Sequence, residues 1–476
     1  MQNTVLVINQ NDSQTRAIVK KLRAEQICAL MVPSDISPEA ILAAAPRGLI
    51  IAGGVLGSTD TVFNEEWLLP NLPVLALGDA ALTLLTKLGG TPAPHALPSG
   101  LHPVTSSEAA IFHQFGDEER YLANVYPLVL SDSLESWVQA DGLCVGYTHN
   151  ERPLFGLQLH IEQNDLDAAQ VLSSFATDVC LCPRQWESDY LVEFTTGDIC
   201  AAAGDAPVLA ELSGGVDSSV CALLGHLAVG DRLQCYFVDT GLLRPAIMAE
   251  TLAFFRDTKG IDVQIIDAKA RFFEKLKGLT TNSEKEFAIH CLLEKIREEK
   301  KAELGAGILL SAVNAADVMR GEADADYQKE GTATPLAQFF KDEIRRLGES
   351  LGLPPAIYNR QPFPETGLAL RIYGVADEEK IALLNQIDAI FLDEAEKSGQ
   401  AKKLWQHFAM LMPVEPQYLV CLRAVNLVDG DSVQAARLSF ELLEETTARI
   451  LNEVPCVARV LYDFTGRRCA ADIQWP

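Results

Sequence analysis

Seven residues that join an apolar run to a helical run have the types and spacing of a phosphate-binding turn. Residues 213–219 read SGGVDSS, and the candidate binding residues are Ser213, Gly214, Gly215, Val216, Asp217, Ser218 and Ser219. Glycines let backbone N–H groups approach an anion closely, and the following helix adds partial positive charge at its N-terminus. The Asp217 carboxylate would repel a bare phosphate, so its presence predicts a Mg²⁺ ion between the two. The full string therefore favours a Mg²⁺–phosphate site over a glycine turn that serine and aspartate merely cap.

The turn lies within a regular alternation of short apolar strands and amphipathic helices. Such an alternation predicts a mainly parallel sheet with helices on both of its faces. In the first part of the chain the predicted strands are 4–8, 48–54, 73–78, 143–147 and 154–162, and the predicted helices are 13–26 and 167–180. Around the turn the predicted strands are 207–212, 233–239, 263–267 and 307–312, and the predicted helices are 218–228, 244–257, 283–304 and 340–352. The sequence thus predicts two consecutive doubly wound α/β domains with parallel sheets.

The order of the elements changes after a proline-rich break at residues 359–367. A predicted helix at 377–397 is followed by strands at 418–428 and 458–464, which indicates a smaller α+β unit. We therefore expect three domains. Their predicted bounds are 1–186, 187–359 and 360–476, with the polar stretch 183–189 as the first linker.

Several long motifs accompany the turn in the same order as in a known family. The turn has no Gly-Lys-Ser/Thr and so is not a Walker A loop, but it resembles the SGGxDS loop of the N-type ATP pyrophosphatases. FVDTGLLR at 237–244 resembles the FVDxGLLR segment of GMP synthetases. RQPFPETGLALRIYG at 360–374 and LNEVPCVARVLYDFTG at 451–466 are similar to further motifs of that family. The second and third units therefore resemble its synthetase core and dimerisation domain.

This resemblance implies an ATP-dependent ligase that uses Mg²⁺. In the family, ATP is cleaved between the α and β phosphates, the C2 oxygen of xanthosine monophosphate (XMP) is adenylated, and ammonia displaces AMP. The resemblance places Val238 and Asp239 against the adenosine part of ATP. Asp217, also the candidate metal ligand, and Lys341 are the candidate catalytic residues; the alternative for Lys341 is a solvated lysine on an amphipathic helix. The resemblance also implies a small-molecule substrate and a homodimer.

The first unit resembles a class I glutamine amidotransferase that has lost its nucleophile. Its GLQLHIE segment is similar to the family's GVQFHPE, which puts His160 and Glu162 at the base and orienting positions. The nucleophile turn of the family reads PVLGICYGMQ, whereas this chain has PVLALGDAAL from Pro73, with Gly78 at the cysteine position. Glutamine hydrolysis needs a thiolate, which glycine cannot supply. We therefore expect no glutamine hydrolysis in this unit and a separate source of ammonia.

The segments that carry the nucleotide acceptor in the family depart from its pattern. The family's KSHHNVGG has no counterpart in MRGEADADYQKEGTATPL at 319–336, and its GVMGDxRTY is reduced to EPQYLVC at 415–421. In the C-terminal tail, Arg467 falls near a lysine of the family and is a candidate for the substrate phosphate; the alternative is a solvated arginine pair. The chain therefore resembles a diverged paralogue whose ATP half matches the family and whose acceptor, XMP or a related one, stays open.

The bulk composition disfavours several classes of partner. The chain has 476 residues and a net charge of −26, which disfavours extended contact with nucleic acid. No apolar run is long enough to span a bilayer, so we expect no membrane partner. The 11 cysteines are scattered and odd in number, which fits a reducing, cytoplasmic compartment. Cys180 and Cys182 lack the second pair that a zinc site would need, so we interpret them as structural.

Three functional hypotheses follow from these motifs. The leading one is a ligase of the GMP synthetase type that takes ammonia from a separate protein or from solution. The second is a sulfur-transfer relative that would depend on a sulfur-donating protein. The third is a non-catalytic paralogue that binds ATP and a partner protein. The complete SGGVDSS turn favours catalysis, because a turn released from that role could drift in sequence.

Overall fold

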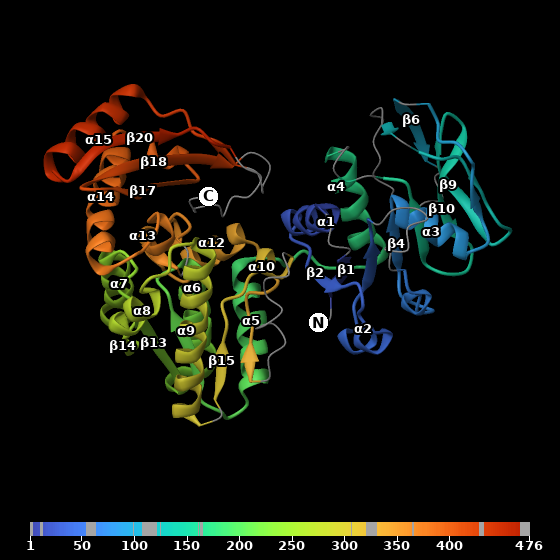
Figure 1. Cartoon of the computed structure of the whole chain (residues 1–476). Helices are drawn as coiled ribbons and strands as arrows, with labels where there is room; N and C mark the ends of the chain where they lie inside the picture. Colours follow the sequence, from blue (N-terminus) through green and yellow to red (C-terminus); the bar gives the residue numbers. More distant parts are fainter. Residues whose placement is uncertain are drawn as a thin grey trace. The chain divides into compact units, whose positions relative to one another are not determined.

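The protein has an α/β fold, as the sequence predicted, in two compact units. Tertiary contacts divide the chain into Met1–Leu191 and Val192–Pro476 (Figure 1). The computed structural model describes residues 3–9, 13–53, 63–98, 100–106, 121–123, 125–159, 161, 165–305, 307–319, 331–363, 366–427 and 433–466.

A nine-stranded sheet forms the centre of the first unit. Its strand order is β2-β1-β3-β4-β11-β10-β9-β6-β7. The strands are β1 (Val5–Asn9), β2 (Ala29–Pro33), β3 (Gly48–Ile51), β4 (Val74–Leu77), β6 (Leu101–Ser106), β7 (Tyr121–Ala123), β9 (Leu134–Ala140), β10 (Leu143–His149) and β11 (Leu154–Leu157). Strands β2, β1, β3, β4 and β11 pair in parallel, and the rest of the sheet is antiparallel. A separate two-stranded pair joins β5 (Thr91–Pro92) to β8 (Leu128–Val129).

Four helices accompany this sheet in the described part of the unit. They are α1 (Ser13–Ala24), α2 (Pro38–Ala44), α3 (Asp79–Lys87) and α4 (Asp165–Ser174), and α4 continues into a π-helical turn at Phe175–Val179. Helices α1 and α3 contact the parallel strands of the sheet. Strands β3 and β4 are buried along their whole length, as expected for central parallel strands covered on both faces. Helix α3 packs on β4 and β11. The β4–α3 turn therefore lies at the carboxyl end of a central strand.

The second unit begins with a fully parallel five-stranded sheet. Its order is β14-β13-β12-β15-β16. The strands are β12 (Val208–Leu212), β13 (Leu233–Asp239), β14 (Val263–Asp267), β15 (Ile308–Leu310) and β16 (Thr332–Ala333). Side chains alternate between the two faces of a strand, so Leu209 and Ala210 project to opposite sides. Leu209 belongs to a core cluster that also contains residues of helix α9 (Asn282–Leu304). On the opposite face, Ala210 is the register partner of Leu310 on β15, and Leu310 contacts helix α6 (Val216–Val229) at Gly225.

Further helices surround this sheet and connect it to the C-terminal part. They are α5 (Ser188–Ala203), α7 (Pro245–Leu252), which continues into a π-helical stretch at Ala253–Thr258, α8 (Lys269–Leu276), α10 (Ala315–Met319), α12 (Lys341–Ser350), α13 (Pro355–Tyr358) and the 3-10 helix η5 (Gly367–Arg371). Helix α12 packs beside α6, where a Cβ on Gly348 would lie 3.2 Å from the Val220 side chain.

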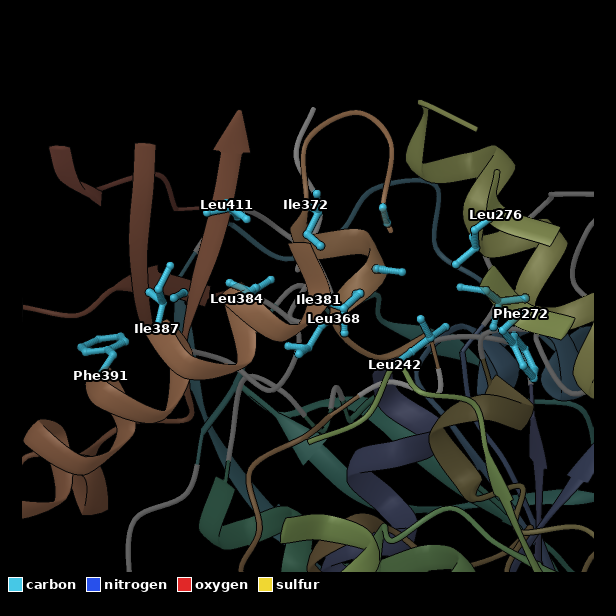
Figure 2. Packing of buried hydrophobic residues seen from close by; sticks show 14 of the residues in the cluster. Leu242, Phe272, Leu276, Leu368, Ile372, Ile381, Leu384, Ile387, Phe391 and Leu411 are labelled. Carbon is cyan, nitrogen blue, oxygen red and sulfur yellow. The ribbon is translucent and has the colours of Figure 1, made fainter. Parts of the chain in front are cut away.

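A four-stranded sheet and two helices complete the second unit. Strand β18 (Gln417–Leu427) pairs with β17 (Gln406–Val414) along one edge, and with β20 (Val457–Asp463) and β19 (Val433–Ala435) along the other. Helix α14 (Glu378–Lys397) packs on β17 and on α15 (Phe440–Glu453). One hydrophobic core runs from the parallel sheet into this part (Figure 2). It includes Leu242 and Phe272 on one side and Leu384 and Leu411 on the other.

The predicted elements around the glycine turn are confirmed closely, and the departures are local. Strands β13 and β14 have the predicted bounds, and helix α6 begins two residues before the prediction. Helix α5 begins at Ser188, inside the stretch predicted as a linker. None of the described helices is long and apolar enough to cross a membrane.

Candidate nucleotide site

The SGGVDSS turn lies where β12 ends and α6 begins, at the carboxyl edge of the parallel sheet. Open α/β sheets bind ligands at this edge. Gly214 has a φ of +82°, and a Cβ at this position would lie 2.2 Å from Cγ2 of Ile247. Gly215 is the N-cap residue of α6 and provides no side-chain cap. A side chain at Gly214 would therefore clash with Ile247, whereas Gly215 is partly exposed and leaves the start of α6 without a side-chain cap.

The hydroxyl groups of the turn bond within the turn itself. Ser218 Oγ accepts from the backbone N–H of Ser213 at 3.2 Å and lies 3.0 Å from Ser213 Oγ. Ser219 Oγ donates to the carbonyl oxygen of Gly215 at 2.8 Å. These hydrogen bonds fix the shape of the turn. The backbone N–H groups at the start of α6 are the donors that face outward from a helix N-terminus.

Asp217 and Lys341, both predicted as catalytic, form an ion pair. Lys341 Nζ donates to Asp217 Oδ2, although the two residues are 124 positions apart. Lys341 is the first residue of α12, and the packing of α12 on α6 brings it to the turn. The second carboxylate oxygen, Oδ1, is buried and has no hydrogen-bond partner among the described residues. An unsatisfied carboxylate oxygen beside this glycine turn fits a Mg²⁺ ligand.

Two arginines that the sequence analysis did not assign lie at the same turn. Arg360 donates from Nη1 to the carbonyl oxygen of Gly214 and from Nη2 to the carboxylate of Glu250. Arg345 lies one helical turn beyond Lys341, close enough that the Asp217 charge opposes the lowering of its pKa by burial. Its Nε is buried and has no hydrogen-bond partner in the described part of the chain. Both arginines belong to motifs that are visible in the sequence, but only the fold shows that they reach the turn.

Asp239 lies at the same edge of the sheet, at the end of the neighbouring strand. In the β12–β13 register, Phe237 is opposite Leu212, so Asp239 extends two residues beyond the end of β12. Its carboxylate accepts from the backbone N–H of Gly241 at 3.1 Å and pairs with Lys269 Nζ at 2.8 Å. The hydrogen bond with Asp239 raises the pKa of the Lys269 ammonium. The adenosine contact that the resemblance implied for Asp239 stays a prediction.

Val238, the other predicted adenosine contact, has its side chain in the hydrophobic core. It is buried together with Tyr236 and the apolar side chains of α9. Val238 belongs to β13, so only its main chain could contact a nucleotide at the edge of the sheet.

In the first unit, the turn at Gly78 keeps a conformation that only glycine adopts readily. Gly78 has φ +59° and ψ −128° between β4 and α3, and its N–H donates to the carbonyl oxygen of Leu157 at 2.9 Å.

His160 and Glu162 lie outside the described residues, as does Arg467 of the C-terminal tail. Cys180 and Cys182 are buried, as predicted, and burial raises the pKa of the Cys182 thiol to about 12. No cluster of three or more metal-ligating side chains occurs within the ranges that the structure describes.

Comparison with known proteins identifies the family. The NAD synthase family model matches residues 189–411, the part that holds the parallel sheet and the glycine turn. The model for the GMP synthase C terminal domain matches residues 393–475. An ATP pyrophosphatase unit of the NAD synthase type is thus joined to a GMP synthase C-terminal domain.

Relatives over the whole length agree with these two matches. The chain is 30% identical to GMP synthase [glutamine-hydrolyzing] of Caldanaerobacter subterraneus subsp. tengcongensis, over 100% of this chain and 99% of the relative. It is 31% identical to the protein of the same name from Carboxydothermus hydrogenoformans, over 100% of both chains. The chain therefore belongs to the GMP synthase family. The first alignment extends over 523 residues, more than the 476 of this chain, so the relative has residues with no counterpart here.

Proposed function

We propose that the chain adenylates a carbonyl-type oxygen of XMP or a related acceptor at the expense of ATP, with release of pyrophosphate. Ammonia that its own first unit does not produce then displaces AMP. Membership of the GMP synthase family supports an ATP-using enzyme in general. The observation that carries the specific proposal is the meeting of Lys341 and Asp217 at the glycine turn.

The residues of the turn can bind and orient the phosphate chain of ATP. Backbone N–H groups at the start of α6 face an anion at this edge of the sheet, and Lys341, Arg345 and Arg360 supply positive charge around it. These fixed donors would stabilise the charge that develops on the departing pyrophosphate. When bound, Mg²⁺ would neutralise phosphate charge, and Asp217 is the residue that would hold it.

The acceptor is proposed from the family and not from a site in the structure. Residues 320–330 belong to the segment that replaces the family's KSHHNVGG, and they lie outside the described residues. Family membership leaves XMP or a related purine nucleotide as the proposed acceptor, with Arg467 as the candidate contact to its phosphate.

The nitrogen source is proposed to lie outside the chain. Position 78 has no side chain, so the turn between β4 and α3 offers no nucleophile for a glutamyl thioester. Free ammonia or a separate ammonia-donating protein would then supply the second step. We further propose a cytoplasmic homodimer, on the basis of the GMP synthase C-terminal domain match and the cysteine content.

Pyrophosphate release with defined substrates tests this proposal. Wild-type protein with ATP, Mg²⁺, XMP and ammonium chloride is expected to release pyrophosphate and form GMP. The same mixture with glutamine instead of ammonium is expected to form no GMP. If XMP fails and a panel of related purine nucleotides supports pyrophosphate release, the acceptor is reassigned. If ATP binds but no acceptor yields pyrophosphate, the proposed catalysis is wrong and a nucleotide-binding role replaces it.

A further inference from the structure

A buried carboxylate on α14 joins three segments of the second unit. Asp388 Oδ2 accepts from Nε of Arg244 at 2.7 Å and lies 3.6 Å from Nη1 of Arg371. The other oxygen, Oδ1, accepts from the backbone N–H of Ala409 at 2.8 Å. Asp388 and Arg371 are fully buried. One carboxylate therefore ties the loop after β13 to η5 and to β17.

Aromatic rings fix the orientation of the two guanidinium groups. Cζ of Arg244 lies 4.6 Å from the centre of the Phe363 ring, and Cζ of Arg371 lies 4.8 Å from the same ring. Arg371 also lies 4.2 Å from the ring centre of Phe408. Planar guanidinium groups stack on aromatic faces, and a paired charge in a buried site holds a defined geometry. Loss of the shared carboxylate would leave both arginines without their common counter-charge.

Arg244 connects this cluster to the wall of the glycine turn. It is the N-cap residue of α7, so its position sets where α7 begins. Ile247 of α7 lies directly over Gly214, where an added Cβ would be 2.2 Å from its side chain. Glu250 of α7 pairs with Arg360, which in turn donates to the carbonyl oxygen of Gly214. A shift of α7 would therefore move both contacts that hold Gly214.

The loop between β13 and α7 meets η5 at a second point. The N–H of Leu368 donates to the carbonyl oxygen of Leu242 at 2.9 Å. A Cβ on Gly367, whose φ is +63°, would lie only 2.3 Å from the same oxygen. Leu242 and Leu368 also belong to one hydrophobic core (Figure 2). The loop thus packs on η5 at Leu242. At the other end of the loop, Asp388 joins Arg244 to Arg371 of η5.

We propose that Asp388 is a positioning residue for ATP. Through Arg244 and α7 it fixes residues 213–219 in the conformation that receives the phosphate chain. Asp388 itself is fully buried and acts on the turn only through these neighbours. The proposal rests on the proposed function in that ATP is taken as the ligand of the turn.

The variant Asp388→Asn tests this role in the full-length protein. It keeps an oxygen for the Ala409 N–H and removes the charge shared by the arginines. We expect the Kd for ATP with Mg²⁺, measured by calorimetry, to rise about tenfold. We also expect faster hydrogen exchange in Pro245–Leu252 of the ligand-free protein. Asp393→Asn is the matched control, because Asp393 lies on the same helix with an exposed side chain paired with Lys397 and Arg449, and it should leave both quantities unchanged.

Folded Asp388→Asn with a wild-type ATP Kd and wild-type exchange in α7 would overturn the proposal. If this variant does not fold, Arg244→Lys decides, because it keeps the positive charge but loses the two contacts to one carboxylate oxygen. Faster exchange in α7 with a weakened ATP Kd supports the role, and wild-type values for both overturn it. If wild-type protein binds no ATP, the proposed function fails. Hydrogen exchange in Pro245–Leu252 of the ligand-free variants would then still decide whether Asp388 positions α7.

Discussion

Lys341 and Asp217 form an ion pair between the first turns of two neighbouring helices, α12 and α6. A lysine at the first position of a helix lies at the positive end of the helix dipole, which disfavours it. Its position is therefore not explained by the stability of α12 alone. The pairing places a cation beside the turn proposed to bind phosphate and leaves one oxygen of Asp217 without a hydrogen-bond partner among the described residues.

Replacing Lys341 should abolish catalysis while the fold persists. In Lys341→Met the cation that balances the phosphate chain is lost, and we expect pyrophosphate release to fall by about a hundredfold or more. The measurement is the steady-state rate with saturating ATP, acceptor and ammonium. Arg346→Met on the same helix is the control, because Arg346 is exposed and lies 3.7 Å from the carboxylate of Asp342. Equal losses in both variants would contradict a specific role for Lys341.

Two glycines with positive φ should respond differently to alanine. Gly214→Ala combines the strained φ with a clash on Ile247, so we expect a loss of about 2–4 kcal/mol in the free energy of unfolding. Gly230→Ala has the strained φ but no atom within 4 Å of the added Cβ, so we expect a loss of about 1 kcal/mol. Urea denaturation measures both. Calorimetry should also show weakened ATP binding in Gly214→Ala alone, and similar behaviour of the two variants would refute the steric argument.

Glutamine should not replace ammonium as the nitrogen source. Gly78 provides no thiol at the turn between β4 and α3, so the thioester step has no nucleophile there. We expect no glutamate to form above the background of a protein-free sample, with or without ATP and acceptor. Ammonium chloride in the same assay is the positive control. Glutamate formed in proportion to GMP would show that another residue supplies the nucleophile.

His407 should make the protein sensitive to acid. Burial lowers the pKa of this histidine to about 4, and the charges of Arg244 and Arg371 act in the same direction, against that of Asp388. Between pH 6.5 and 4 the unfolded chain binds a proton at this site that the folded chain does not, so stability falls as the pH falls through this window. The contribution is up to about 3 kcal/mol.

His407→Leu isolates this contribution. Urea denaturation of wild type and variant at about pH 7 and about pH 4.5 gives two differences in the free energy of unfolding. The wild type is expected to lose more stability than the variant on acidification, because leucine has no proton to bind. Identical losses would show that His407 does not titrate in this range.

Much of the fold follows from local sequence patterns. The apolar runs that became β12 and β13 are short and mostly buried, as is typical of central parallel strands, and the edge strand β14 was predicted with its observed bounds although most of its residues are not buried. The turn at 213–219 was equally readable, because its glycines act through their own backbone. Strand β17 was not among the predicted strands, and its first six residues are all buried. Helix α5 was missed because the polar start at Ser188 was interpreted as a linker.

Local sequence is enough to specify the strand–helix order, the glycine turn between β12 and α6 and the lack of a nucleophile at position 78. Each of these is a property of residues close together in the chain. Only the folded chain shows that Arg360 holds the carbonyl of Gly214 and that Asp388 holds Arg244. Those contacts join residues 146 and 144 positions apart. They exist because packed helices and one shared core bring distant segments together, which no local pattern specifies.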